Sequence, residues 1–211
     1  MEKKHKFRTI IFYKDYFEEF FVKQRPKVKD KIIWTLDIIE DLQRVPETYL
    51  KHLESTDGLF EIRVQQGSDI FRIFCFFDHG QLVVLTNGFQ KKTQKTPKQE
   101  IEKALKIKQE YENEKNNSKT LAQLKDEQYG KRGTVKREKL EAGYETFKIG
   151  AMIQEARLEK GLTQDELAEK CGTTKSYISR IENNIKEVRI STLQKIVELG
   201  FGGHLQLSIK L

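Results

Sequence analysis

Hydrophobic residues recur along this chain with two periods, and each period predicts a different kind of element. Residues 8–13 are β-branched and aromatic and predict a first strand. Three further runs, 59–64, 69–77 and 81–88, alternate across two faces and are separated by turn residues. Strands joined by such short turns predict an antiparallel meander.

Helical spacing fills the gap between the first strand and the meander. Asp15 is positioned to cap a helix that ends near Lys23, and Pro26 opens a longer one to about residue 43. Large apolar residues on these helices are interpreted as core rather than as a base-stacking platform: Phe17, Phe20, Phe21 and Trp34. The order strand, two helices, three strands predicts an α+β fold, with an antiparallel sheet and helices on one face.

The second half changes to helical periods throughout. Helices are expected from Pro97, over 121–128, from about Lys136, and over 147–160, with polar breaks between them. Residues 205–211 alternate and predict a short C-terminal strand. We therefore expect residues 1–112 to form one domain, 113–146 a linker and lead-in segment, and 147–211 an all-α domain.

Residues 163–184 carry the most specific pattern in the chain. Two short helices flank Gly172, where positive φ is permitted, and Thr174 is placed to cap the second helix. Ile178 and Ile181 lie three apart and face inward. The outer face of that helix then carries cations and hydroxyls, which is what reading the DNA major groove requires.

This stretch closely resembles the helix-turn-helix of the lambda-repressor-like (Xre) family. The matching residues are Thr163, Gln164, Leu167, Ala168, Gly172, Ser176, Ile178, Ser179, Glu182 and Asn183. The resemblance implies that Gln164 and Asn183 contact the DNA backbone and that Arg157 pairs with Glu182. We add Thr174 as a phosphate contact, and the predicted base readers are Lys175, Ser176, Arg180, Tyr177 and Ser179.

Candidate phosphate-binding residues gather in and after the predicted meander. Arg63 shares a strand face with Glu61, and Arg72 interrupts an otherwise apolar row. No acidic residue occurs from 79 to 99, a stretch that holds four lysines: Lys91, Lys92, Lys95 and Lys98. These cations suit a nucleic-acid backbone. The alternatives are a solvated lysine loop and a purely structural pairing of Glu61 with an arginine.

Residues 7–112 resemble the HigB branch of the RelE/ParE toxin superfamily, on the stretches KHLESTDGLFEIRV, FRIFCFF and LTNGFQKKTQKTPKQEIEKA. The resemblance implies a RelE-like fold and metal-independent cleavage of mRNA on the ribosome. The predicted catalytic residues are Arg63, Arg72, Lys91, Lys92 and Lys95, and the predicted RNA-binding residues are Lys91, Lys92, Lys95 and Lys98. The segment lacks the tyrosine or histidine that such toxins carry near the last strand. Glu61, His52 and His79 are weaker acid–base candidates.

From Lys119 the chain resembles the lead-in of HigA-type antitoxins, so we expect a fused toxin–antitoxin of the HigBA type. Its second half would repress its own operator as a homodimer. Residues 119–146, or the DNA-binding domain, would cover Arg63, Arg72 and the lysines, or would make the toxin too bulky for the ribosome. The alternatives are a transcriptional regulator with an inactive toxin-like domain and a ParE-like gyrase poison.

Composition agrees with these expectations. The formal net charge is +7, which suits a polyanionic partner. Cys75 and Cys171 are single and far apart, so we expect buried free thiols. The chain shows no secretory signal or apolar run of membrane-spanning length, so we expect a cytoplasmic protein without membrane contact, metal or cofactor.

Overall fold

The computed structural model describes residues 6–80, 82–91, 96–114, 118–184 and 188–207. It divides into two compact units, residues 1–140 and 141–211. The division falls inside a long helix, α5 (Val135–Glu159), whereas the sequence predicts that the first domain ends at residue 112. The charged helix expected from Lys136 and the helix expected over 147–160 are therefore one continuous element.

The first unit is built on a sheet with the strand order β2-β3-β4-β5-β1-β6. The strands are β1 (Thr9–Tyr13), β2 (Leu50–His52), β3 (Leu59–Gln66), β4 (Asp69–Asp78), β5 (Leu82–Gln90) and β6 (Ser118–Thr120). Strands β3, β4 and β5 pair antiparallel in sequence, so the predicted meander is confirmed. The two three-residue strands, β2 and β6, were not predicted.

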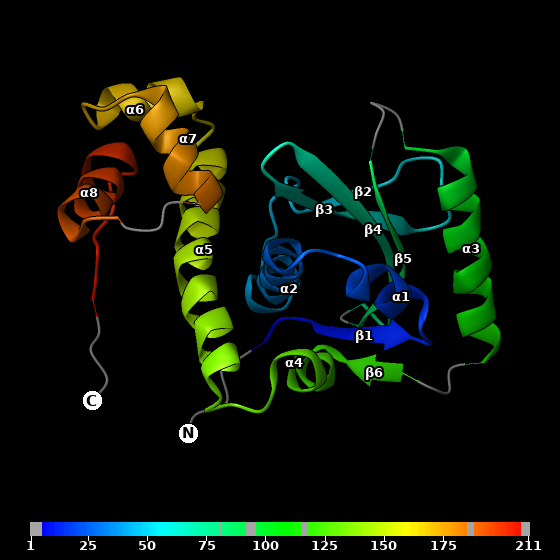
Figure 1. The fold of residues 1–211 in the computed structure, drawn as a ribbon. Helices are drawn as coiled ribbons and strands as arrows, with labels where there is room; N and C mark the ends of the chain where they lie inside the picture. Colours follow the sequence, from blue (N-terminus) through cyan, green and yellow to red (C-terminus); the bar gives the residue numbers. More distant parts are fainter. Residues whose placement is uncertain (1–5, 81, 92–95, 115–117, 185–187, 208–211) are drawn as a thin grey trace. The chain divides into compact units, whose positions relative to one another are not determined.

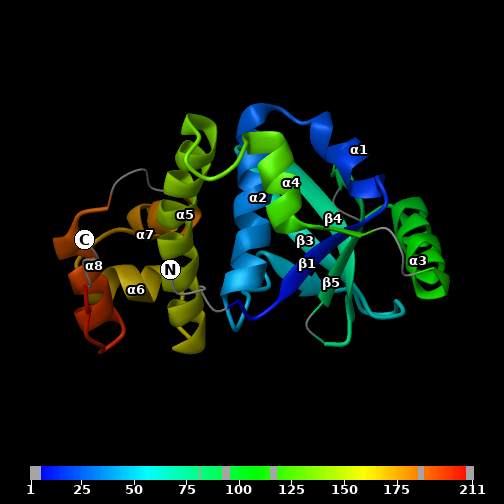
Figure 2. The ribbon, with the colours of Figure 1, turned by 90° about the horizontal axis from the view of Figure 1, so that it is seen from below.

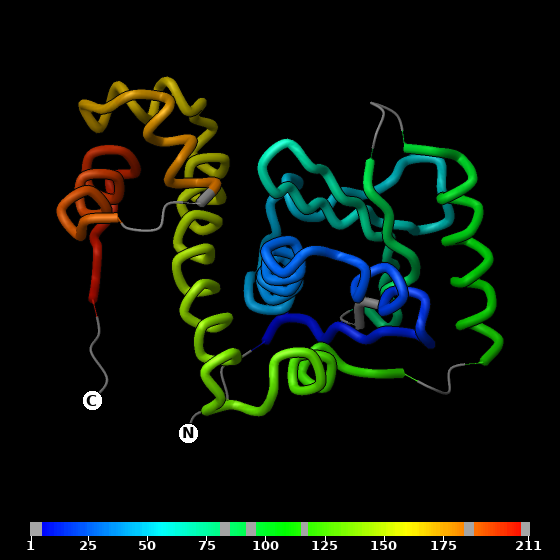
Figure 3. Tube along the Cα trace, viewed as in Figure 1, coloured from blue at the N-terminus to red at the C-terminus, as the bar shows by residue number. Residues whose placement is uncertain are grey.

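The sheet is mixed rather than antiparallel, because β1 pairs parallel with β5. Ile10 lies opposite Val83 and Ile11 opposite Val84. On its other edge β1 pairs antiparallel with β6 (Figures 1 and 3). In this pairing Phe12 lies opposite Lys119. The first strand of the chain is thus interior to the sheet, between two strands that come much later in the sequence.

Helices cover both faces of this sheet, so the expectation of helices on one face is wrong. Helices α1 (Tyr16–Val22) and α2 (Pro26–Asp41) pack on one face, and α3 (Lys98–Asn113) packs on the other (Figure 2). The cause is the alternation within the strands, which leaves both faces apolar. Phe71, Ile73 and Cys75 point to α1 and α2, while Phe74 and Phe76 point to α3.

Residues 118–140 belong to the first unit, although the sequence suggests a linker there. Strand β6 leads directly into α4 (Leu121–Tyr129), which begins with a capping box between Thr120 and Gln123. Four apolar residues of this segment join the core against α1 and α2: Leu121, Leu124, Tyr129 and Leu140. Trp34 Nε1 donates to the carbonyl of Leu140 at 2.8 Å. We call residues 118–140 the docking segment.

The second unit is helical and contains the predicted two-helix motif. After the C-terminal part of α5 come α6 (Gln164–Lys170), α7 (Lys175–Asn184) and α8 (Ile190–Lys195), which continues as a π-helical turn, η1 (Ile196–Gly200). Its core consists of Ile153, Leu167, Ala168, Cys171, Ile178, Ile181 and Ile196. Gly172 has the expected positive φ, 63°. The predicted strand over 205–211 is absent from 205–207, and 208–211 lie outside the described residues.

We predict that Leu124→Ala destabilises the first unit by about 2–5 kcal/mol, because it deletes a fully buried side chain and leaves a cavity. Urea unfolding of the full chain measures this. The matched control is Leu199→Ala, at a leucine that is 59% exposed, which should cost less than about 0.5 kcal/mol. Equal effects of the two substitutions would mean that α4 is not part of the core.

Candidate nucleic-acid interfaces

The outer face of α7 presents the residues that the sequence predicts to read DNA. Ile178 and Ile181 are buried beneath the helix. Lys175, Ser176, Arg180 and Asn183 are exposed, and Tyr177 and Ser179 are half-buried. Thr174 caps the helix, accepting a hydrogen bond from the Tyr177 N–H at 3.3 Å. The face is therefore accessible, polar and held on a rigid helix.

Two cations on this face already have neighbours within the unit. Lys175 Nζ lies 2.6 Å from Asp165 Oδ2 at the start of α6, with both side chains mostly exposed. The Arg180 guanidinium lies 5.6 Å from the centre of the Tyr177 ring, a cation–π contact that holds it along the helix surface. Asp165 was not singled out from the sequence, although an acidic residue so close to a base reader affects its charge.

A buried ion pair locks α7 to the helices before it. Arg157 donates from Nε and Nη2 to the two carboxylate oxygens of Glu182, at 2.6 and 3.0 Å, which confirms the predicted pair. Gln164 Nε2 also donates to Glu182, at 2.8 Å. Glu182 is fully buried, so loss of Arg157 would leave a charge unpaired at a cost of about 3–5 kcal/mol. In the free protein the side-chain amide of Gln164 therefore stabilises the Arg157–Glu182 ion pair.

A second cluster lies on the α3 side of the sheet in the first unit. Arg63 and Arg72 are cross-strand partners on β3 and β4, which places two cations directly opposite each other. Such a pair is unfavourable unless an anion offsets it. Glu61 supplies that anion, since its Oε1 lies 3.0 Å from Arg63 Nε and 2.9 Å from Arg72 Nε.

The two arginines differ in their contact with solvent. The side chain of Arg72 is 11% exposed, and its Nη1 donates to the Phe71 carbonyl at 2.9 Å. Burial lowers the pKa of Arg72, against the opposing attraction of Glu61. The side chain of Arg63 is 31% exposed. Arg63 is therefore the member of the pair that is more accessible from solvent.

The lysine-rich stretch after β5 is described only in part. Lys91 continues the strand pairing, since its N–H donates to the Ile70 carbonyl at 2.7 Å. Thr96 Oγ1 donates to Glu61 Oε2 at 3.0 Å, which ties the end of the stretch to the arginine cluster. Lys98 is exposed at the start of α3. The predicted catalytic residues Lys92 and Lys95 lie outside the described residues.

The register of β2 adds one cation that sequence reasoning missed. Lys51 lies directly opposite Glu61, so it projects on the same face as the arginine cluster. The clue in the sequence was the alternation around KHL, but a three-residue strand is too short to be recognised by period. The adjacent His52 is exposed, with its ring 5.0 Å from that of Phe60. His79 occupies a turn with φ 50°, as expected.

The docking segment lies on the other side of the sheet from this cluster. Its apolar residues pack with Ile10, Phe12 and the residues of α1 and α2, whereas Phe74 and Phe76 share their face with α3. Residues 118–140 therefore do not cover Arg63 or Arg72, and that part of the expected inhibitory cover is wrong. The alternation of β3 and β4 fixes this result, because it sends the arginines to the α3 face.

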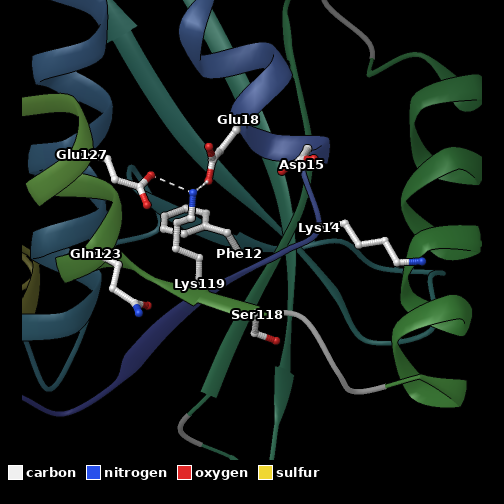
Figure 4. Close-up of a pocket in the computed structure, with 8 residues that line it drawn as sticks. All are labelled: Phe12, Lys14, Asp15, Glu18, Ser118, Lys119, Gln123 and Glu127. Carbon is white, nitrogen blue, oxygen red and sulfur yellow. Dashed lines mark hydrogen bonds and ion pairs between the residues drawn. The ribbon is translucent and has the colours of Figure 1, made fainter.

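A small polar pocket marks the seam between the docking segment and the rest of the unit (Figure 4). It has a cavity volume of about 180 Å³. Lys119 crosses it, with Nζ 2.6 Å from Glu18 and 2.7 Å from Glu127. Lys14 lines the same pocket but extends toward α3, where it pairs with Glu110. The ion pairs of Lys119 fasten β6 to α1.

A second ion pair lies deeper in this seam. Lys125 Nζ donates to both oxygens of Asp37, at 2.6 and 2.7 Å, and links α4 to α2. Asp37 is 6% exposed. Burial raises the pKa of Asp37 to about 6, while Lys125 acts in the opposite direction. The ion pair thus holds α4 of the docking segment against α2, although burial of the Asp37 carboxylate is itself unfavourable.

Two family models match this chain, one in each unit. Residues 19–109 match the model described as Phage derived protein Gp49-like (DUF891), and residues 153–199 match the helix-turn-helix model. A stretch of 49 residues is 47% identical to the HTH-type transcriptional regulator SinR of Bacillus subtilis (strain 168), and equally to SinR of Bacillus licheniformis. Each alignment covers 23% of this chain and 44% of the relative, so the chain spans less than half of these relatives' length.

The chain therefore joins a Gp49-like domain of the toxin-like class to an Xre-like helix-turn-helix domain. Within the described ranges, no helix is long and apolar enough to cross a bilayer. Over the same residues, no group of three or more His, Cys, Asp or Glu side chains is placed to hold a metal ion.

Asp37 predicts a specific pH dependence of stability. Its folded pKa, about 6, lies above its ordinary value of 3.8, so the folded state binds the proton more tightly. Stability should therefore fall as pH rises from 4 to 6, by about 1–3 kcal/mol from this group. Asp37→Asn should remove that part of the fall, measured by urea unfolding at each pH. Asp15→Asn, at an exposed carboxyl, should leave the profile unchanged.

Proposed function

We propose that this chain is a toxin–antitoxin module of the HigBA type, in which one polypeptide carries both activities. The second unit binds operator DNA through α7 and represses transcription of its own gene. The first unit cleaves mRNA on the ribosome and is kept inactive by the attached DNA-binding domain. The observation that carries the proposal is the pairing of an exposed reading helix with an arginine pair that shares one buried carboxylate.

DNA binding follows from the chemistry of the α7 outer face. Arg180 and Lys175 are suited to the acceptor edge of guanine, and Ser176 to either partner of a base pair. Gln164, Thr174 and Asn183 serve as phosphate contacts at the ends of the motif. Tyr177 holds Arg180 by the cation–π contact, and Ser179 holds Asn183, whose Nδ2 donates to the Ser179 carbonyl at 2.8 Å. A homodimer would present two such helices to two half-sites.

The arginine cluster supports the proposed RNA cleavage. Attack of a ribose 2′-hydroxyl on the adjacent phosphate places negative charge on the phosphorus oxygens in the transition state, and fixed cations stabilise that charge. Arg63, the more exposed arginine, is assigned this contact, and Arg72 supports it from within. Lys51, Lys91 and Lys98, with Lys92 and Lys95 as predicted from the sequence, neutralise flanking phosphates.

The attached DNA-binding domain inhibits mRNA cleavage by making the chain too large for the ribosomal site. The docking segment does not inhibit it by covering the arginines. That segment packs on the α1 and α2 face, away from the arginines. A fragment of residues 1–140 keeps the docking segment and both cores of the first unit, since every residue of these cores lies within it. The fragment should therefore fold and cut, while the full chain should not.

We predict that Arg63→Ala slows ribosome-dependent mRNA cleavage by the 1–140 fragment roughly hundredfold, the usual effect of removing one transition-state donor. Primer extension on translated mRNA measures the rate. Arg25→Ala, at an exposed arginine on the other side of the sheet, is the control and should leave the rate unchanged. A folded 1–140 fragment that cuts no mRNA would exclude the nuclease, and inhibition of gyrase instead would favour the ParE-like alternative.

We predict that Arg180→Ala weakens binding of the full chain to a selected operator by about 1–3 kcal/mol and relaxes specificity at one base pair. Arg25→Ala should bind as the wild type does. Fluorescence anisotropy against the operator and against single-base variants distinguishes these results. Unchanged affinity and specificity would remove Arg180 from the reading face.

A further inference from the structure

Glu61 is a nearly fully buried carboxylate in the middle of the candidate RNA site. It is 2% exposed and lies on β3, on the face that α3 covers. A carboxylate in this position is costly unless cations or donors surround it. Its partners come from three separate segments: Arg63 on the same strand, Arg72 on β4, and Thr96 just before α3.

The two oxygens of Glu61 divide these partners between them. Oε1 lies within 3.0 Å of Nε of both arginines, and Oε2 accepts the Thr96 hydroxyl proton at 3.0 Å. Both oxygens are thus engaged, one by the two arginines and the other by a hydroxyl donor. Because the carboxylate is 2% exposed and both of its oxygens already have partners, it is not open to a substrate hydroxyl, so Glu61 does not fit the role of general base.

The contact with Glu61 also sets the orientation of the Arg63 guanidinium. Its Nε is bound to Glu61, which fixes the plane of the guanidinium, yet the side chain stays 31% exposed. The two arginines and Glu61 together carry one net positive charge. An incoming phosphate therefore meets a guanidinium whose orientation is already set, and binding does not have to order it.

We propose that Glu61 is a positioning residue of the RNA site. It holds Arg63 in the orientation that contacts the scissile phosphate, offsets the repulsion between Arg63 and Arg72, and anchors the chain at Thr96. This inference rests on the proposed nuclease for its effect on rate, but the ordering of Arg63 is a property of the free protein. The two parts are therefore tested separately.

The first test is NMR exchange of the Arg63 Nε–H in the full chain. In the wild type this proton should exchange slowly with water, and in Glu61→Gln it should exchange about ten- to a hundredfold faster, as expected on loss of a charge-assisted hydrogen bond. Glu54→Gln, at an exposed glutamate of the same unit, is the control and should leave the rate unchanged. Equal exchange in wild type and Glu61→Gln overturns the proposal.

Thr96→Val covers the case in which Glu61→Gln does not fold. It removes only the hydroxyl that holds Oε2, so it should speed exchange of the Arg63 Nε–H by a smaller factor, roughly two- to fivefold, a fraction of one hydrogen bond. An unchanged exchange rate in a folded Thr96→Val protein overturns the anchoring role of Thr96, and with it the shared anchor that the proposal describes.

The second test is the pH profile of cleavage by the 1–140 fragment. Glu61→Gln should lower kcat at least about tenfold while the pH profile keeps its shape, because Glu61 acts by orienting Arg63 and not by transferring a proton. Loss of an ionisation from the profile would identify Glu61 as a base and overturn the proposal, as would an unchanged kcat. A wild-type fragment that never cuts rejects the nuclease itself, while the exchange experiment still decides the positioning role.

Discussion

The pairing of β1 with β6 is the constraint on which the arrangement of the first unit depends. Strand β1 pairs with β5 on one edge. It is interior to the sheet only because residues 118–120, which come about a hundred residues later, pair with its other edge. The lysines at 119 and 125 then fasten the same segment to α1 and α2, and Leu121 and Leu124 complete the core there. An edge left open at β1 would expose unpaired backbone groups and an apolar face together. The segment that resembles an antitoxin lead-in is thus a structural part of the toxin-like unit.

This arrangement separates the two tasks of the first unit between the two faces of one sheet. The alternation of β3 and β4 sends Ile62, Ile73 and Cys75 toward the face covered by α1 and α2, on which the docking segment also packs, and sends Glu61, Arg63 and Arg72 toward α3. The face that packs against the docking segment and the face proposed to bind RNA are therefore separate. The cost of holding two opposed arginines is offset by one buried carboxylate, and the cost of burying Asp37 is offset in part by Lys125.

Much of the fold was predictable, because it is encoded by local periods. The meander, both N-terminal helices, the Gly172 turn, the Thr174 cap and the Arg157–Glu182 pair all follow from short-range pattern or from resemblance. The pairing of β1 with β5 and β6 was not predictable, because no local sequence pattern specifies which distant strands pair or in which register. For the same reason the sequence suggested Arg63 and Arg72 but not Lys51, whose place opposite Glu61 depends on a three-residue strand. The helix α3 was predicted, but not that it closes the second face of the sheet.

Residues 118–129 are an integral part of the first unit and not a linker. Native-state hydrogen exchange on the full chain tests it most directly, because backbone protection reports local opening. We predict that the amide of Lys119 and the amides in the middle of α4, such as that of Leu124, exchange as slowly as those of β4 and are lost in the same unfolding event. Exchange of these amides at the rate of an unstructured peptide, while β4 stays protected, would mean that residues 118–129 are a linker.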